Sequence, residues 1–166
     1  MSANRVHSDN QRWITPREIT KPLGLFDLDP CADIDQPWAH AKHQWTIRDD
    51  GLSREWSGRV WLNPPYGRQT GAWLNRLAEH GNGIALVFAR TETRMFHDYV
   101  WPTASGVLFL KGRPHFCYPS GLPANGNSGG PLMLIAYGEQ NSELLRLANI
   151  PGKWVNLIQR EGGDDE

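Results

Sequence analysis

The tetrapeptide Asn63-Pro64-Pro65-Tyr66 has the residue types and the spacing needed to bind a planar amino group. The side-chain oxygen of Asn63 and the carbonyl of Pro64 could each accept one of the two hydrogens of that group. Proline has no N–H and holds φ at about −65°, so this backbone is stiff and offers acceptors without donors beside them. Tyr66 could stack on a nucleic-acid base, a contact worth about 1–3 kcal/mol. The pattern suits methylation of adenine N6 or cytosine N4, and the alternative is a proline-stiffened turn with a buried tyrosine.

The elements around this tetrapeptide follow from runs of apolar residues. Val60-Trp61-Leu62 predicts a short buried strand that ends at Asn63, because prolines follow. Thr15, Pro16 and Glu18 predict a capping box for a short helix that Pro22 stops. Further strands are predicted at 25–29, 44–47, 84–88, 107–110, 132–137 and 154–158, with 115–118 pairing to 107–110. Further helices are predicted around 73–78, 95–100 and 142–148, and a loop over 119–131.

Strands that alternate with helices of about ten residues predict an α/β domain with a mostly parallel sheet flanked by helices, a compact Rossmann-like fold. In such sheets ligands bind outside the carboxyl ends of the strands. Asp29, Asn63 and Arg90 all come at predicted strand ends. We expect one domain over residues 13–160, with a disordered end at 1–12 and an acidic disordered tail at 161–166.

The charged residues are unevenly distributed along the chain. There are 17 basic and 18 acidic residues, a net charge of −1. The segment 27–50 is mainly acidic, whereas the segment 54–113 has eight basic residues against four acidic ones. One part of the surface could therefore meet a cationic ligand and another a polyanion, although solvated helix faces would give the same pattern.

Cysteine and hydropathy patterns argue against several classes of protein. Cys31 and Cys117 form no CxxC pair, so neither a structural zinc site nor a disulfide framework is expected. The polar first twenty residues lack a signal-peptide core, and no run of eighteen apolar residues occurs. We expect a cytoplasmic protein with no metal and no membrane partner.

Several pieces of the chain, taken in order, resemble the phage-type DNA N-6-adenine methyltransferases, a branch of the S-adenosylmethionine-dependent class I enzymes. They are Trp13-Ile14-Thr15-Pro16, Phe26-Asp27-Leu28-Asp29-Pro30-Cys31-Ala32, Asp50-Gly51-Leu52 with Trp56, Trp61-Leu62-Asn63-Pro64-Pro65-Tyr66-Gly67, Ala89-Arg90-Thr91-Glu92-Thr93 and Gly112-Arg113 with Phe116. The Asn-Pro-Pro-Tyr motif alone is shared with protein-glutamine methyltransferases, and the ordered set is more specific.

The resemblance implies a catalytic motif, a donor pocket and DNA contacts. The catalytic residues would be Asn63, Pro64, Pro65 and Tyr66. The pocket for S-adenosylmethionine would be formed by Trp13, Thr15, Pro16, Asp29, Pro30, Cys31, Ala32 and by Asp49 or Asp50. Candidate DNA contacts are Arg68, Arg90, Arg94 and Arg113, with the Ser120–Gly130 loop as either a groove reader or a flexible connector.

The expected reaction is direct methyl transfer to N6 of an adenine rotated out of the duplex, without a cysteine nucleophile. Three alternatives stay open at this point. The same acceptors could bind a protein glutamine amide or the N4 group of cytosine, and the chain could be a non-catalytic DNA-binding or anti-restriction module. The target sequence, with GATC as a first guess from the resemblance, a restriction partner and the oligomeric state are not given by the sequence.

Overall fold

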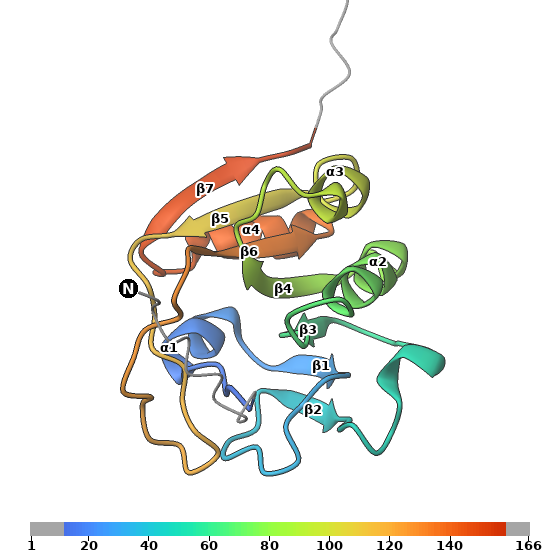
Figure 1. Ribbon diagram of the computed structural model, residues 1–166. Helices are drawn as coiled ribbons and strands as arrows, with labels where there is room; N and C mark the ends of the chain where they lie inside the picture. The colour runs from blue at the N-terminus through green and yellow to red at the C-terminus, as the bar shows by residue number, and fades with distance from the viewer. Residues whose placement is uncertain (1–11, 159–166) are drawn as a thin grey trace, which may run out of the picture.

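The computed structural model describes residues 12–158, which form a seven-stranded sheet with helices on both faces (Figure 1). The helical elements are α1 (Arg17–Thr20), η1 (Lys21–Leu23), η2 (Gly51–Ser53), α2 (Thr70–His80), α3 (Arg94–Tyr99) and α4 (Glu139–Leu147). The strands are β1 (Phe26–Asp29), β2 (Ala41–Gln44), β3 (Val60–Leu62), β4 (Gly83–Phe88), β5 (Gly106–Leu110), β6 (Leu132–Tyr137) and β7 (Gly152–Asn156). The predicted α/β class is confirmed.

The sheet has the order β2-β1-β3-β4-β6-β5-β7. Strands β2, β1, β3 and β4 pair in parallel, whereas β6 pairs antiparallel with both β4 and β5, and β7 antiparallel with β5. Strands β1 to β5 therefore share one direction, which β6 and β7 oppose. The expectation of a mostly parallel sheet holds for the half that carries the Asn63 motif.

Two apolar layers hold the helices to the sheet. Trp73, Leu74 and Leu77 of α2 pack with Phe96 of α3 on one face. On the other face Ile19 of α1, Leu23 of η1 and Leu145 of α4 pack with Trp61. Because Val60, Trp61 and Leu62 are all fully buried, β3 is held from both sides and the residue that follows it has a fixed position.

Five local predictions from the sequence differ from the structure, and the first two concern strands. The predicted strand 44–47 lies three residues earlier, as β2, because Ala41 pairs with Phe26, while Ile47 is 85% exposed. The segment 115–118 does not pair with β5, because β6 and β7 occupy both edges of that strand; Cys117 forms isolated bridges with Ile14 and Pro123 instead.

The predicted capping box at Thr15 is also wrong, since α1 begins after Pro16 and has no side-chain cap. The Thr15 hydroxyl instead accepts a hydrogen bond from the side chain of Asn63. Pro22 does not end the helical segment but sits inside η1, where the first turn of a helix tolerates proline. The strand predicted at 154–158 is β7, which lies two residues earlier.

Candidate active site

A cavity of about 870 Å³ lies where β1 and β3 end. Asp29 is the last residue of β1, Asn63 directly follows β3, and both line this cavity. Residues from four separate parts of the sequence complete the wall, within 12–15, 29–40, 46–52 and 61–73. The predicted ligand position outside the strand ends therefore coincides with a cavity that holds the Asn63 motif.

The side-chain amide of Asn63 is oriented by three neighbours. Its Nδ2 donates to the Thr15 hydroxyl over 3.1 Å and to the Trp13 carbonyl over 3.4 Å. A carbonyl only accepts, so the nitrogen must face Trp13 and the oxygen must face the opposite way. That oxygen accepts a hydrogen bond from the Tyr66 hydroxyl over 3.1 Å and keeps a second lone pair. Within residues 12–158 no donor bonds the Pro64 carbonyl, so two acceptors are available at the cavity.

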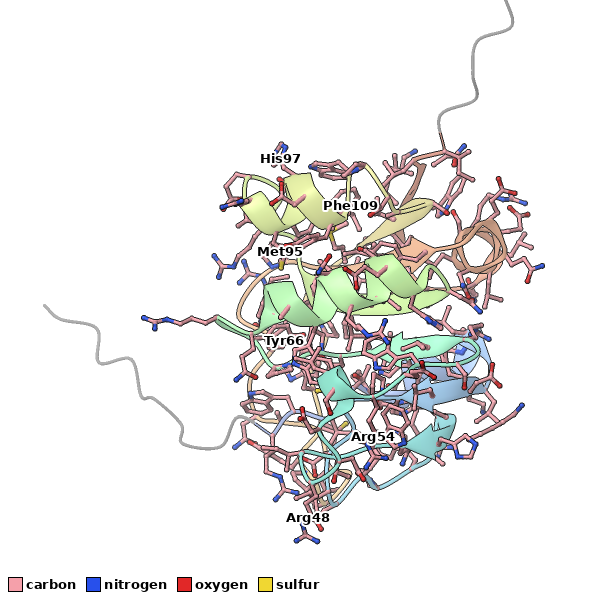
Figure 2. All side chains as sticks on the ribbon, turned by 90° about the vertical axis from the view of Figure 1, so that its right-hand side faces the viewer. Arg48, Arg54, Tyr66, Met95, His97 and Phe109 are labelled. Carbon is pink, nitrogen blue, oxygen red and sulfur yellow. The ribbon has the colours of Figure 1, made fainter. Side chains whose placement is uncertain are left out.

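Tyr66 is held by its ring as well as by its hydroxyl. The ring packs on Phe88, the last residue of β4, with centroids 4.8 Å apart and planes tilted by 52°. Burial raises the pKa of Tyr66 above its usual value, so the hydroxyl remains a donor. Thr70, the first residue of α2, bonds the Pro65 carbonyl and the Gly67 N–H, which fixes the turn between β3 and α2. Figure 2 shows Tyr66 close to α2.

Asp29 is a buried carboxylate with two hydrogen-bond partners. Its Oδ1 accepts from the backbone N–H of Cys31 over 2.9 Å, and its Oδ2 contacts Nε2 of His40 over 2.7 Å. His40 is itself buried and its Nδ1 faces Gln36. Because the carboxylate is partnered on both oxygens, its position at the floor of the cavity is fixed, and each oxygen still has a free lone pair.

Glycine at position 51 lets two walls of the cavity approach each other. Gly51 is buried, and a Cβ there would overlap the Pro30 carbonyl and contact the Trp73 ring. Its own carbonyl accepts from the indole N–H of Trp56 over 2.8 Å. Only glycine can bring η2 this close to the end of β1. This close approach explains why position 51 of the Asp50-Gly51-Leu52 piece is glycine, and the bond to Trp56 explains why Trp56 accompanies it.

The acidic side chains around the cavity have different surroundings. Asp50 lines the cavity and is exposed, with a left-handed φ of 51°. Asp49 does not line it, and its Oδ2 accepts from the Thr46 N–H, which closes a turn. Asp33 at the rim bonds Arg12, and this hydrogen bond lowers the pKa of the Asp33 carboxyl.

The donor-pocket residues suggested by the sequence are mostly brought together. Those that line the cavity are Trp13, Thr15, Asp29, Pro30, Cys31, Ala32 and Asp50. Pro16 and Asp49 lie outside the lining. Burial, followed by the charge of Asp29, raises the pKa of the Cys31 thiol to about 12, so that this cysteine stays a neutral thiol.

The four candidate DNA contacts are all exposed, but they occupy different places. The Arg90 guanidinium lies 5.7 Å from the centre of the Phe88 ring, next to Tyr66, and Arg68 comes two residues after Tyr66. Arg94 on α3 pairs with Asp98 of the same helix. Arg113 comes three residues after the end of β5. Arg90, over Phe88, and Arg68, two residues after Tyr66, are the pair nearest to the motif.

The loop between β5 and β6, residues 111–131, packs at two points of this region. Gly121 lies against Trp38, beside the acidic wall of the cavity, and Gly130 lies against the Phe88 ring. The loop also has hydrogen bonds within its own backbone, such as the one from the Ala124 N–H to the Phe116 carbonyl over 2.7 Å, so it has internal structure. In Figure 1 the orange part of this loop extends past α1 toward the β2 side of the sheet.

Sequence reasoning missed His40, Phe88 and Trp73 as wall or support residues. Phe88 carried a usable signal, since it ends a predicted strand next to the Asn63 strand. His40 carried none, because its contact with Asp29 depends on a loop of eleven residues. Trp73 lines the cavity, and its buried indole N–H has no hydrogen-bond partner in the part of the chain described.

Residues 12–158 lack two features that mark other classes of protein. They contain no group of three or more His, Cys, Asp or Glu side chains placed to hold a metal ion. They also contain no helix with the length and hydropathy needed to cross a membrane. Residues 1–11 and 159–166 lie outside the described residues, and they include all of the predicted disordered ends, 1–12 and 161–166, except residue 12.

Comparison with known proteins assigns the family. The family model for DNA N-6-adenine-methyltransferase (Dam) matches residues 2–148, which include the whole cavity and the Asn63 motif. No curated protein and no solved structure matches significantly. The match covers most of the chain and agrees with the resemblance of its ordered motifs. The chain therefore belongs to the DNA N-6-adenine-methyltransferase (Dam) family.

Proposed function

We propose that this chain transfers a methyl group from S-adenosylmethionine to N6 of an adenine that has been rotated out of the DNA duplex. The observation that carries the proposal is the fixed orientation of the Asn63 amide at the wall of the cavity. Its oxygen, oriented by Thr15, Trp13 and Tyr66, presents a free lone pair beside an unbonded Pro64 carbonyl. An amino group with two hydrogens matches two such acceptors.

These acceptors would make the adenine nitrogen reactive. The N6 lone pair is normally delocalised into the ring, and two hydrogen bonds to its hydrogens favour a tetrahedral nitrogen whose lone pair can attack. As the C–N bond forms, the C–S bond of the donor would break and leave a neutral thioether. The positive charge would pass to N6, where the Asn63 and Pro64 oxygens would stabilise it until N6 loses one proton to water. Tyr66 would stack on the base, which contributes about 1–3 kcal/mol. The Cys31 thiol, with its pKa raised to about 12, is not a nucleophile here.

The cavity residues fit the proposed donor. The donor supplies an electrophilic methyl group on a positively charged sulfur. Asp29 and Asp50 give the cavity wall the negative charge that favours a cation. The aromatic side chain of Trp73 adds an apolar surface to this wall. Trp13, Thr15, Pro30, Cys31 and Ala32 would form the remaining wall, with Pro16 behind it.

The DNA would meet the exposed arginines next to the motif. Arg68 and Arg90 flank the Tyr66–Phe88 pair, so phosphate contacts there would hold the duplex over the cavity. Arg94 and Arg113 would extend this contact. The loop residues 120–130 are proposed to reach a groove, and their internal hydrogen bonds support a shaped element over a flexible connector.

The test is methylation of plasmid DNA by the purified protein with labelled S-adenosylmethionine, followed by methylation-sensitive sequencing. We expect methyladenine at one short sequence. Asn63→Ala should lower kcat by about 10²–10³-fold, the range for losing one group that stabilises transition-state charge. Asn75→Ala, a partly exposed asparagine on α2, is the matched control and should keep its activity.

Three results would contradict the proposal. Methyl transfer to protein glutamine but not to DNA would assign the motif to the other substrate. Methylation of cytosine N4 would keep the chemistry and change the base. If a calorimetric titration shows no binding of S-adenosylmethionine, the remaining interpretation is a non-catalytic DNA-binding module.

A further inference from the structure

The five residues before α1, Arg12 to Pro16, form a segment that we call the N-terminal strap. It crosses the cavity wall beside the catalytic motif, and four of its residues line the cavity. Ile14, Thr15 and Pro16 are buried, with Ile14 2% and Thr15 3% exposed. The strap is thus a packed part of the site, although it lies about fifty residues before Asn63 in the sequence.

The strap is anchored independently of Asn63. Ile14 and Cys117 exchange two backbone hydrogen bonds, of 2.9 and 2.8 Å, which pair the strap with the β5–β6 loop. At its start, Arg12 bonds the carboxylates of Asp33 and Asp35 at the rim of the cavity. Thr15 lies between these anchors and the first helix, so its hydroxyl has a fixed position.

From this fixed position Thr15 bonds the amide nitrogen of Asn63 and not its oxygen. The Thr15 Oγ1 to Asn63 Nδ2 distance is 3.1 Å, shorter than the 3.4 Å to the Trp13 carbonyl. The carbonyl determines which way round the amide lies, because it can only accept, and the hydroxyl holds the nitrogen there. Burial of the Thr15 side chain keeps water from replacing this bond.

We infer that Thr15 is a positioning residue for the transfer step, which it serves by holding the Asn63 amide so that its oxygen faces the substrate amino group. This inference rests on the proposed function. It gives Thr15 a role in turnover in addition to its place in the wall of the donor cavity, and valine at this position keeps the shape of that wall. The N-terminal strap would then support Asn63. The β5–β6 loop would in turn support the strap, through the bridge between Ile14 and Cys117.

The test compares Thr15→Val, which keeps the shape of the side chain and removes the acceptor, with Thr15→Ser, which restores it. We expect Thr15→Val to lower kcat about tenfold, since a buried amide nitrogen loses its nearest partner. Donor affinity measured by calorimetry should stay within about twofold, and Thr15→Ser should recover most of the lost kcat. Thr20→Val is the matched control, because Thr20 is also 3% exposed and has no hydrogen bond to Asn63 among residues 12–158.

A second readout needs no turnover. The side-chain amide signal of Asn63 in ¹⁵N-labelled protein, identified by its loss in Asn63→Ala, should shift in Thr15→Val and not in Thr20→Val. If wild-type protein fails to methylate adenine while this shift occurs, the proposed function fails and the positioning contact stands.

Either of two results would overturn the inference while leaving the proposed function intact. In the first, Thr15→Val weakens donor binding and leaves kcat unchanged, which would make Thr15 a donor contact. In the second, Thr15→Val and Thr20→Val lose kcat and melting temperature equally, which would make the effect one of general packing.

Discussion

The Tyr66 hydroxyl donates a hydrogen bond to the side-chain oxygen of Asn63 over 3.1 Å. Tyr66, which we expect to stack on the base, is therefore also bonded to Asn63, which we expect to activate the amino group of that base. This bond uses one lone pair of the Asn63 oxygen and leaves one for a substrate hydrogen. The two roles of Tyr66, ring and hydroxyl, can be separated by mutation.

Tyr66→Phe keeps the ring and removes the hydroxyl. We expect kcat to fall by about 2- to 10-fold, because a typical net hydrogen bond is worth about 0.5–1.5 kcal/mol. Tyr66→Ala also removes the stacking surface, worth about 1–3 kcal/mol per base, and should lose at least about a further fivefold in kcat/KM for DNA. Steady-state kinetics on a DNA duplex measure both. Wild-type rates for Tyr66→Ala would exclude the stacking role.

Phe88 supports the ring of Tyr66 at 4.8 Å and contacts Gly130 of the β5–β6 loop. Phe88→Ala should therefore loosen Tyr66 and lower kcat by roughly tenfold. It should also lower the free energy of unfolding by about 1–3 kcal/mol, because a half-buried ring is lost. Phe109 on β5 is the matched control, since it is also half-buried and Figure 2 shows it well apart from Tyr66.

Phe109→Ala should lose similar stability and keep its kcat. Kinetics at a temperature well below both melting points, combined with urea unfolding, separate the two effects. Equal kcat losses in the two variants would show that Phe88 acts through general stability.

Gly51→Ala tests the close approach of η2 to the end of β1. The new Cβ overlaps the Pro30 carbonyl, so Pro30 and the adjoining Asp29 must shift. Overpacking of this kind costs about 1–3 kcal/mol, and we expect weaker donor binding by calorimetry together with a lower melting temperature. Gly71→Ala on α2 is the control, because nothing lies within 4 Å of its added Cβ. It should be neutral or stabilise by up to about 1 kcal/mol. Unchanged donor affinity in Gly51→Ala would mean that the donor does not use this wall.

Arg90→Ala tests the DNA contact beside Phe88. Loss of one phosphate contact should weaken DNA binding and lower the slope of log K against log salt by about 1. Arg146 on α4, an exposed arginine paired with Glu143, is the control and should leave the slope unchanged. Fluorescence anisotropy at several salt concentrations gives the slopes. Equal slopes for Arg90→Ala and wild-type protein would place the DNA elsewhere.

The sequence predicted the parts of this molecule that local physics determines. Proline after Asn63 ends β3, and the left-handed Gly81 caps α2. Both effects act within a few residues, and the predicted end of the strand at Asn63 is confirmed. The common position of Asp29 and Asn63 at strand ends was also predictable, because parallel neighbours end at the same edge of a sheet.

What could not be predicted depends on contacts between distant segments. Thr15 has a good local capping pattern, yet its hydroxyl bonds Asn63, forty-eight residues away. Cys117 pairs with Ile14 because β6 and β7 already occupy the edges of β5, a fact of the whole sheet. Asp49 and Asp50 have the same charge and adjacent positions, and only the three-dimensional turn directs one into the cavity.

The pH dependence of stability tests the burial of Cys31 at the cavity wall. Burial raises its pKa from 9.0 in the unfolded chain to about 12 in the folded protein, so the folded state favours the neutral thiol. Below pH 9 both states hold the proton and its stabilising contribution is fully present. As pH rises from 9 toward 12, the unfolded chain loses its proton first, and the free energy of unfolding falls.

Tyr66 and Tyr137, whose pKa values are also raised by burial from 10.0, add a loss of the same sign at higher pH. We therefore expect wild-type stability in urea to decline between about pH 9 and about pH 10, with a flatter profile for Cys31→Ala. Alkylation of the two cysteines tests separately whether the Cys31 thiol faces the cavity, with Cys117 as the control. The pKa of Cys117 is raised in the same direction, but its thiol does not line the cavity, so donor binding should slow alkylation of Cys31 and not of Cys117. Identical pH profiles for wild-type protein and Cys31→Ala would show that water reaches this thiol in the folded state.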